Sequence, residues 1–178
     1  MNGGMAMKTG SVLIVALMFL VPFPVNAGRL LREATDAALV PVAEDDPAKA
    51  VLRLDLSEVP RGARLAGVFL EGTMKDLPAD GSLWLAAYPI QGDWDQREVR
   101  SGREEVAADE EPAATWGISP LDHERNGGFV RLDLTDLARS WRGGVQANYG
   151  VMIVAEGIDA EVLQAGLAGL KLVLLYSE

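Results

Sequence analysis

The sequence predicts an all-β protein, an antiparallel β-sandwich with one short helix, in a chain of 178 residues. Three observations predict this fold. Several short segments have the alternation or the composition of strands, clusters of turn residues separate them, and a single segment has clear helical spacing. Because the chain is 49% hydrophobic, it can bury one core without metals or disulfides.

Residues 1–27 have the features of a secretory signal peptide. Lys8 precedes an apolar run over residues 12–21, and Val25 and Ala27 lie at the positions that signal peptidase reads before a cleavage site. The run is shorter than the roughly 20 residues of a membrane-spanning helix, and an uncleaved anchor is the alternative. We expect cleavage after Ala27, a secreted or periplasmic protein, and no membrane span afterwards. The net charge then changes from −10 to −11, because Lys8 is the one charged residue removed.

The mature chain divides into an N-terminal segment, residues 28–49, and a β-sandwich domain, residues 50–178. The first segment has an acidic, proline-containing break at residues 44–47, and we expect it to be loosely ordered or to form a first strand followed by a loop. Strands of the domain are predicted at residues 50–56, 65–71, 83–90, 130–134, 151–155 and 170–176. Residues 91–128 are acidic and lack periodicity, so we expect a long excursion with one or two short strands near Trp116.

The motif Arg-Leu-Asp-Leu occurs twice, at residues 53–56 and 131–134. Each copy reads as a half-buried strand with its leucines toward the core, which leaves Arg53, Asp55, Arg131 and Asp133 on outward faces. We expect two strands of one sheet whose charged side chains form cross-strand ion pairs. If that sheet face is a binding surface, these four side chains would line it instead.

The clear helix prediction covers residues 135–142. Thr135 is a suitable N-cap, Asp136 lies in the first turn, and Leu137 and Trp141 are four residues apart on one face. Trp141 is therefore assigned to the core. A second helical turn at residues 160–168 is an alternative that glycine disfavours.

The composition excludes several kinds of chemistry. With no cysteine, the chain has no disulfide, no thiol nucleophile and no cysteine metal site. His123 is the one histidine and lies in a predicted surface loop. The chain therefore lacks the histidines that a multi-histidine metal site requires and has one candidate for a catalytic triad. The net charge of −10 opposes binding to nucleic acid, whose phosphates require clustered Lys and Arg.

Five elements, in this order, resemble the DNRLRE-domain proteins. They are the strand and turn at residues 52–63, the tryptophans Trp94 and Trp116, the helix start at residues 134–137 with Trp141, the turn at residues 148–151, and the closing run at residues 170–176. The resemblance covers residues 49–176. It implies a jelly-roll β-sandwich of a secreted protein, related to carbohydrate-binding modules and without a catalytic precedent.

Three aromatic residues, Trp94, Trp116 and Tyr88, are the candidate ligand-binding residues. An exposed indole is suited to stacking against the C–H face of a sugar ring, and core filling is the alternative role of the same side chains. Asp93 and Asp95 are the candidate metal ligands, because calcium takes about six to eight oxygen ligands, often from loop carboxylates. A solvated acidic loop is the alternative, and we expect no other cofactor.

We therefore expect a secreted, non-catalytic module that binds carbohydrate or cell-envelope polysaccharide through loop aromatics and an exposed sheet face. A structural or adhesion subunit of the cell envelope, packed against a protein partner, is the alternative. A glycosidase is the third option, because the chain has 26 acidic residues, although no motif places a catalytic pair. Neither the ligand nor the oligomeric state follows from the sequence.

Overall fold

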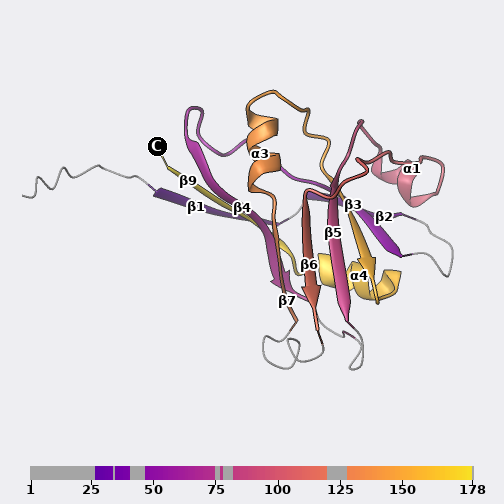
Figure 1. Ribbon diagram of the computed structural model, residues 1–178. Coiled ribbons are helices and arrows are strands. Elements are labelled where there is room, and N and C mark those ends of the chain that lie inside the picture. Colours follow the sequence, from indigo (N-terminus) through magenta and orange to yellow (C-terminus); the bar gives the residue numbers. More distant parts are fainter. Residues whose placement is uncertain are drawn as a thin grey trace, which may run out of the picture.

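The computed structural model describes residues 27–33, 35–40, 47–74, 77, 82–119 and 128–177. These residues form nine β-strands and three helices, and the strands make two antiparallel sheets packed as a β-sandwich (Figure 1). The predicted signal peptide lies outside the described residues, except for Ala27, and so does His123. None of the helices within the described ranges is long and apolar enough to span a bilayer.

One sheet has four strands in the order β1-β9-β4-β7, and the other has five in the order β2-β3-β8-β5-β6. The strands of the four-stranded sheet are β1 (Ala27–Glu33), β9 (Lys171–Ser177), β4 (Arg64–Thr73) and β7 (Phe129–Asp133). Those of the five-stranded sheet are β2 (Thr35–Val40), β3 (Ala48–Arg53), β8 (Val151–Glu156), β5 (Leu83–Pro89) and β6 (Ala114–Ile118). The edge strands β6 and β7 lie next to each other, along one side of the sandwich.

The strand predictions are confirmed for β4, β5, β7, β8 and β9, with ends that differ by up to a few residues. The strand expected at residues 50–56 begins earlier and ends at Arg53. Its partner β8 starts only at Val151, opposite Leu52, so the ladder between them ends there. Leu54 and Leu56 stay buried in the turn that follows.

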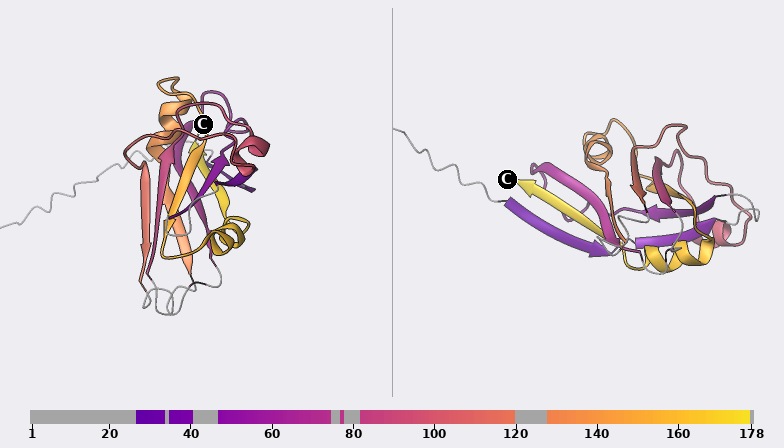
Figure 2. Two further views of the ribbon diagram at one scale, coloured as in Figure 1. Left: turned by 90° about the vertical axis from the view of Figure 1, so that its right-hand side faces the viewer. Right: turned by 60° about the horizontal axis from the view of Figure 1, so that its bottom comes forward.

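The N-terminal segment contributes one strand to each sheet. β1 pairs with β9 at the edge of the four-stranded sheet, and β2 pairs with β3 at the edge of the five-stranded sheet. The expectation of a single, loosely held strand followed by a loop was therefore incomplete. Figure 2 shows β1, β9 and the first part of β4 projecting together as an arm beyond the rest of the sandwich.

The prediction of one short helix was wrong, because the described residues contain α1 (Gln96–Arg100), α3 (Thr135–Arg142) and α4 (Ala160–Leu167). Leu163 and Leu167 are buried one turn apart, which gives α4 an apolar face in spite of its glycine. α3 matches the predicted helix, but Leu134 occupies its N-cap position. The hydroxyl of Thr135 instead donates to Asp133 Oδ1 at 2.5 Å and accepts from the Val68 N–H.

The main core lies between the two sheets. Leu52, Leu70, Leu85, Leu132 and Leu174 come from five different strands and have at most 1% of their surface exposed. Each buried leucine stabilises the fold by about 1.5–3 kcal/mol relative to an exposed one.

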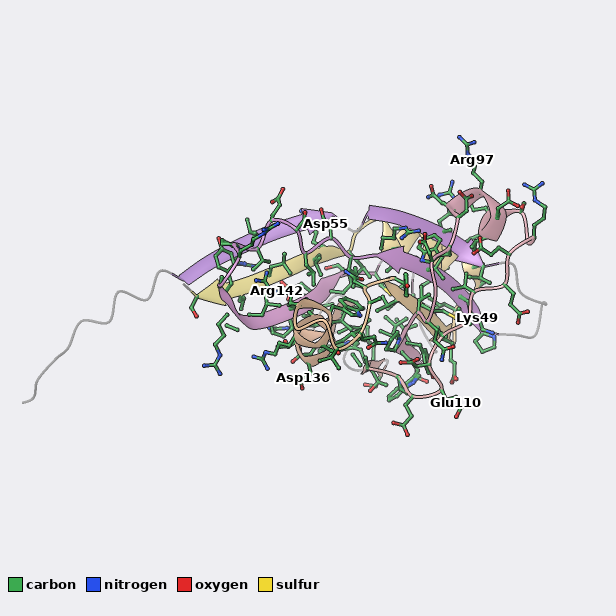
Figure 3. The ribbon with its side chains drawn as sticks, turned by 90° about the horizontal axis from the view of Figure 1, so that it is seen from above. Lys49, Asp55, Arg97, Glu110, Asp136 and Arg142 are labelled. Carbon is green, nitrogen blue, oxygen red and sulfur yellow. The ribbon has the colours of Figure 1, made fainter. Side chains whose placement is uncertain are left out.

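Helix α3 closes one end of the main core. Its Trp141 is buried there, as the sequence predicted. The Arg142 guanidinium donates to the carbonyl oxygens of Val59, Pro60 and Ala63, and so fastens α3 to the turn that precedes β4. Figure 3 shows Asp136 and Arg142 on α3, seen from above.

A second apolar cluster covers the outer face of the five-stranded sheet. It consists of Ala38, Val51, Ile90, Trp94, Val99, Val106 and Met152. Most side chains of β3 and β8 are buried on both faces of the sheet, so these strands need cover on the outside as well as the inside. The excursion after β5, with α1 in it, provides that cover.

The first Arg-Leu-Asp-Leu copy starts at Arg53, the last residue of β3 in the five-stranded sheet, and continues into the turn after it. The second copy starts in β7 of the four-stranded sheet, so the two copies do not share a sheet. Arg131 lies 3.6 Å from Glu71, its partner in register on β4, which confirms a cross-strand ion pair there. Arg53 instead pairs with Asp93 of the excursion. An alternating pattern indicates that one face of a strand is buried, but it does not indicate which sheet contains the strand.

Candidate functional site

An open groove of about 740 Å³ lies along the side of the sandwich where β6 meets β7. Residues 112–116 form one wall, Phe69, Arg131 and Asp133 of the four-stranded sheet form the second, and the start of α3 closes the top. We call it the β6–β7 groove. Its volume is within the range of sites that bind small molecules and short oligomers.

The upper end of the β6–β7 groove is fixed by hydrogen bonds where β7 becomes α3. Asp133 Oδ1 accepts from the backbone N–H and the hydroxyl of Thr135. Since the Thr135 hydroxyl also accepts from Val68 of β4, the first turn of α3 is tied to the four-stranded sheet. The groove is thus lined by a preformed wall.

The charged side chains of the groove are paired with one another or with their neighbours. The Arg131 guanidinium lies 3.8 Å from the centre of the Phe69 ring and 3.6 Å from a Glu71 carboxylate oxygen. Arg139 bonds to Asp136 at 3.0 Å and to the Leu65 carbonyl oxygen. The lining has two arginines and two aspartates, so the groove carries no excess charge of either sign.

Trp116 is the one sequence-predicted ligand residue that lines the β6–β7 groove. Its half-buried ring packs edge-on against Phe129, with ring centres 6.4 Å apart. Its Nε1 atom is buried and has no hydrogen-bond partner among the described residues. Because protein atoms cover this nitrogen, a ligand in the groove meets the exposed part of the indole ring and not its N–H.

Trp94 is buried in this structure and is not exposed as the sequence suggested. Only 4% of its surface is exposed, and its Nε1 donates to the Tyr149 carbonyl oxygen at 2.9 Å. The Arg53 guanidinium lies 4.7 Å from the centre of its ring. Trp94 packs against Val51 and the other residues of the second apolar cluster, and this packing buries its side chain.

Tyr88 is half-buried on β5 and packs against the same second apolar cluster as Trp94. The three predicted aromatics are therefore divided between two places. Trp116 lies in the β6–β7 groove, whereas Trp94 and Tyr88 pack on the outer face of the five-stranded sheet.

Asp93 and Asp95 bind protein groups through their carboxylates. Asp93 Oδ1 accepts from Arg53 at 2.7 Å and from the Trp94 N–H, while Asp95 Oδ1 caps α1 by accepting from the N–H groups of Arg97 and Glu98. Among the described residues, no group of three or more His, Asp or Glu side chains could hold a metal ion. The geometry therefore gives the predicted calcium site no support.

Both carboxylates have a pKa below the ordinary value of 3.8. For Asp93 the main cause is the hydrogen bond from Arg53, and for Asp95 it is the helix-capping bonds from Glu98 and Arg97. The unfolded chain therefore binds more protons than the folded chain as the pH falls. The stabilisation from both groups is complete above about pH 5 and is lost as the pH falls through the lowered pKa values.

We expect a double variant, Asp93→Asn with Asp95→Asn, to be less stable than the wild type at neutral pH. Asparagine still caps a helix, so the variant removes mainly the charges. The difference in urea midpoint should be constant between about pH 5 and pH 7 and should narrow below about pH 4. A difference that stayed the same down to low pH would contradict this account.

Sequence reasoning missed Phe69, Asp136 and Arg139 as parts of the groove. It did place Arg131 and Asp133 on an outward face, which both copies of the Arg-Leu-Asp-Leu motif share. The first copy lies elsewhere, because Arg53 and Asp55 line a separate hollow of about 240 Å³. No local pattern distinguishes the two copies.

The comparisons with known proteins do not assign a family. No family model matches the chain, and no curated protein matches it significantly. The resemblance to DNRLRE-domain proteins stays a prediction.

Proposed function

We propose that this protein is a secreted, non-catalytic module that binds carbohydrate in the β6–β7 groove. The observation that carries the proposal is the open, charge-balanced groove, whose lining combines the half-buried indole ring of Trp116 with polar side chains.

The rest of the groove lining also suits a sugar. Carbohydrates present alternating apolar C–H faces and hydroxyl groups that both donate and accept hydrogen bonds. Trp116 supplies an aromatic ring, and Thr115, Arg131 and Asp133 supply polar groups beside it. Because the lining charges balance, the groove favours a neutral glycan over a polyanion.

A binding role fits the carboxylates of the groove better than catalysis does. Glycoside hydrolysis needs two carboxyl groups, one of which is free to donate a proton. Asp133 is bound to Thr135, and Asp136 is paired with Arg139. Asp133 is therefore part of the wall of the groove, whereas the Asp136 side chain is 96% exposed and pairs with Arg139 one turn away on α3.

We propose further that the sandwich is a jelly roll. A jelly roll has eight strands in two sheets of four, with chain connections that pass between the sheets. The order β1-β9-β4-β7 and the order β3-β8-β5-β6 in the other sheet support a jelly roll with β2 added at an edge. This fold supports the DNRLRE resemblance, and residues 1–27 supply the argument for secretion.

A structural or adhesion subunit of the cell envelope is the second candidate. β1 lies at the edge of its sheet and has one hydrogen-bonded neighbour, β9, among the described strands. An edge strand can pair with a strand of another chain. Co-purification with an envelope protein, together with loss of that partner when β1 is blocked by proline, would favour this role.

The carbohydrate proposal is tested by titrating the protein with neutral and acidic polysaccharides, in calcium and in chelator. We expect binding of a neutral glycan that does not depend on calcium. Trp116→Phe replaces the indole by a smaller ring, and Thr115→Val removes a hydroxyl at nearly constant shape. Each should weaken binding by about threefold to tenfold.

Val145→Ala is the matched control, because Val145 is 84% exposed and does not line the groove. It should bind like the wild type. Wild-type affinity in both Trp116→Phe and Thr115→Val, or no binding to any glycan, would contradict the proposal.

A further inference from the structure

Three large hydrophobic side chains are exposed within the described part of the chain, and two of them flank β6. Trp84 on β5 is 47% exposed, and Phe129 on β7 is 38% exposed. β5 is hydrogen-bonded to β6, and β7 lies along its other side. Trp116 of β6 packs against Phe129, whereas Trp84 lies on the opposite face of the five-stranded sheet, because its neighbour Leu85 is the partner of Trp116.

The indole ring of Trp84 packs over a glycine on the neighbouring strand β6. It lies opposite Gly117 of β6, and a Cβ atom at Gly117 would be 3.2 Å from two atoms of the indole ring. The ring therefore rests against the backbone of β6 and is supported from that side. The exposed part of the indole is a fixed apolar platform.

The Trp84 platform follows the β6–β7 groove along β6. Thr115, which lines the groove, and Gly117 are two residues apart on the strand, so they lie on the same face. This separation is roughly 6.6 Å, which is comparable with the spacing of neighbouring rings in a sugar chain. A glycan that leaves the groove along β6 therefore meets Trp84.

We infer that Trp84 is an outer stacking subsite for glycan chains that extend beyond the β6–β7 groove. The inference rests on the proposed function and adds that the preferred ligand is an oligosaccharide or polysaccharide rather than a single sugar. A ring stacked on Trp84 also lies near Glu156, which is exposed and opposite Trp84 on β8. Its carboxylate can accept hydrogen bonds from sugar hydroxyls.

The surroundings of Trp84 fit a glycan better than a second copy of the chain. A stable protein interface buries more than about 1,000 Å² and has an apolar centre. Trp84 is one aromatic side chain, with the exposed Glu156 opposite it on β8 and the exposed Thr115 two residues from its β6 partner Gly117. Isolated aromatic rings with polar neighbours are typical of contacts with sugar rings.

The test is the dependence of affinity on chain length. Wild-type protein is titrated with cello-, xylo-, manno- and chito-oligosaccharides, from the disaccharide to the hexasaccharide, by calorimetry. We expect the affinity for a bound series to rise with length. Trp84→Ala should lower the affinity for the long members by about fivefold to tenfold and leave that for the shortest unchanged.

Two further variants complete the test. Trp84→Phe retains a ring and should recover part of the loss, while Val145→Ala should bind every length like the wild type. If Trp116→Phe weakens all lengths and Trp84→Ala weakens none, the outer subsite is overturned and the groove proposal stands. An equal loss at every length in Trp84→Ala also overturns it, and no glycan binding by the wild type overturns both proposals.

Discussion

Replacing Trp94 by alanine is expected to lower the free energy of unfolding by about 3–5 kcal/mol. The side chain is 4% exposed and fills the second apolar cluster, so its removal leaves a cavity. It also leaves the Tyr149 carbonyl oxygen without the indole donor, and Arg53 without the ring beneath its guanidinium. Urea denaturation followed by circular dichroism measures the effect.

Trp94→Phe is the matched variant, because it keeps most of the apolar volume and loses the N–H. We expect a smaller cost, about 1–2 kcal/mol, from the unpaired carbonyl and the smaller ring. If Trp94→Ala were as stable as the wild type and yet lost glycan binding, Trp94 would be a ligand platform after all. That result would restore the expectation drawn from the sequence.

Replacing Gly150 by alanine is expected to cost about 3–5 kcal/mol, for two separate reasons. The backbone φ of Gly150 is +95°, in the region that residues with a Cβ atom rarely adopt. A Cβ atom there would also overlap the carbonyl oxygen of Leu52 in β3. That oxygen belongs to the backbone, so it cannot move away without disturbing the ladder between β3 and β8.

Gly62→Ala separates the two reasons, because Gly62 has nearly the same φ, +90°, but no atom within 4 Å of the position of an added Cβ. Gly62→Ala should therefore lower the free energy of unfolding only through its unfavourable backbone conformation, by about 1–2 kcal/mol. Thermal and urea unfolding of both variants measure the difference. Equal losses in the two variants would mean that the contact with Leu52 contributes nothing.

The sequence predicted the sandwich well because its strands are marked by short-range signals. Leu132 and Val130 alternate with charged residues, and that pattern alone identifies β7 as a half-buried strand. The run Val-Met-Ile-Val-Ala in β8 does not alternate, which is the signal that both faces are covered. That signal predicts a layer outside the five-stranded sheet, although it does not say which segment forms it.

The candidate site was predicted less well, because exposure depends on contacts between distant parts of the chain. Trp94 and Trp116 both follow loops and look equivalent in the sequence. Trp94 is covered through its contacts with Tyr149 and Arg53, which lie 55 and 41 residues away. Trp116 is on an edge strand, beside a groove that forms only when β7 and α3 pack next to it.

The position of β9 in the arm of the four-stranded sheet affects how the protein folds. β9 is the last strand of the described chain, yet it lies between β1 and β4 and is hydrogen-bonded to both. During synthesis, β1 therefore has no partner in its sheet, and β4 has only β7, until β9 has been made. Pairing strands so far apart in the sequence is slow, and the unpaired edges invite misassembly in the meantime. A chain cut short before β9 leaves β1 without its hydrogen-bonded neighbour and leaves β4 paired on one side, with β7.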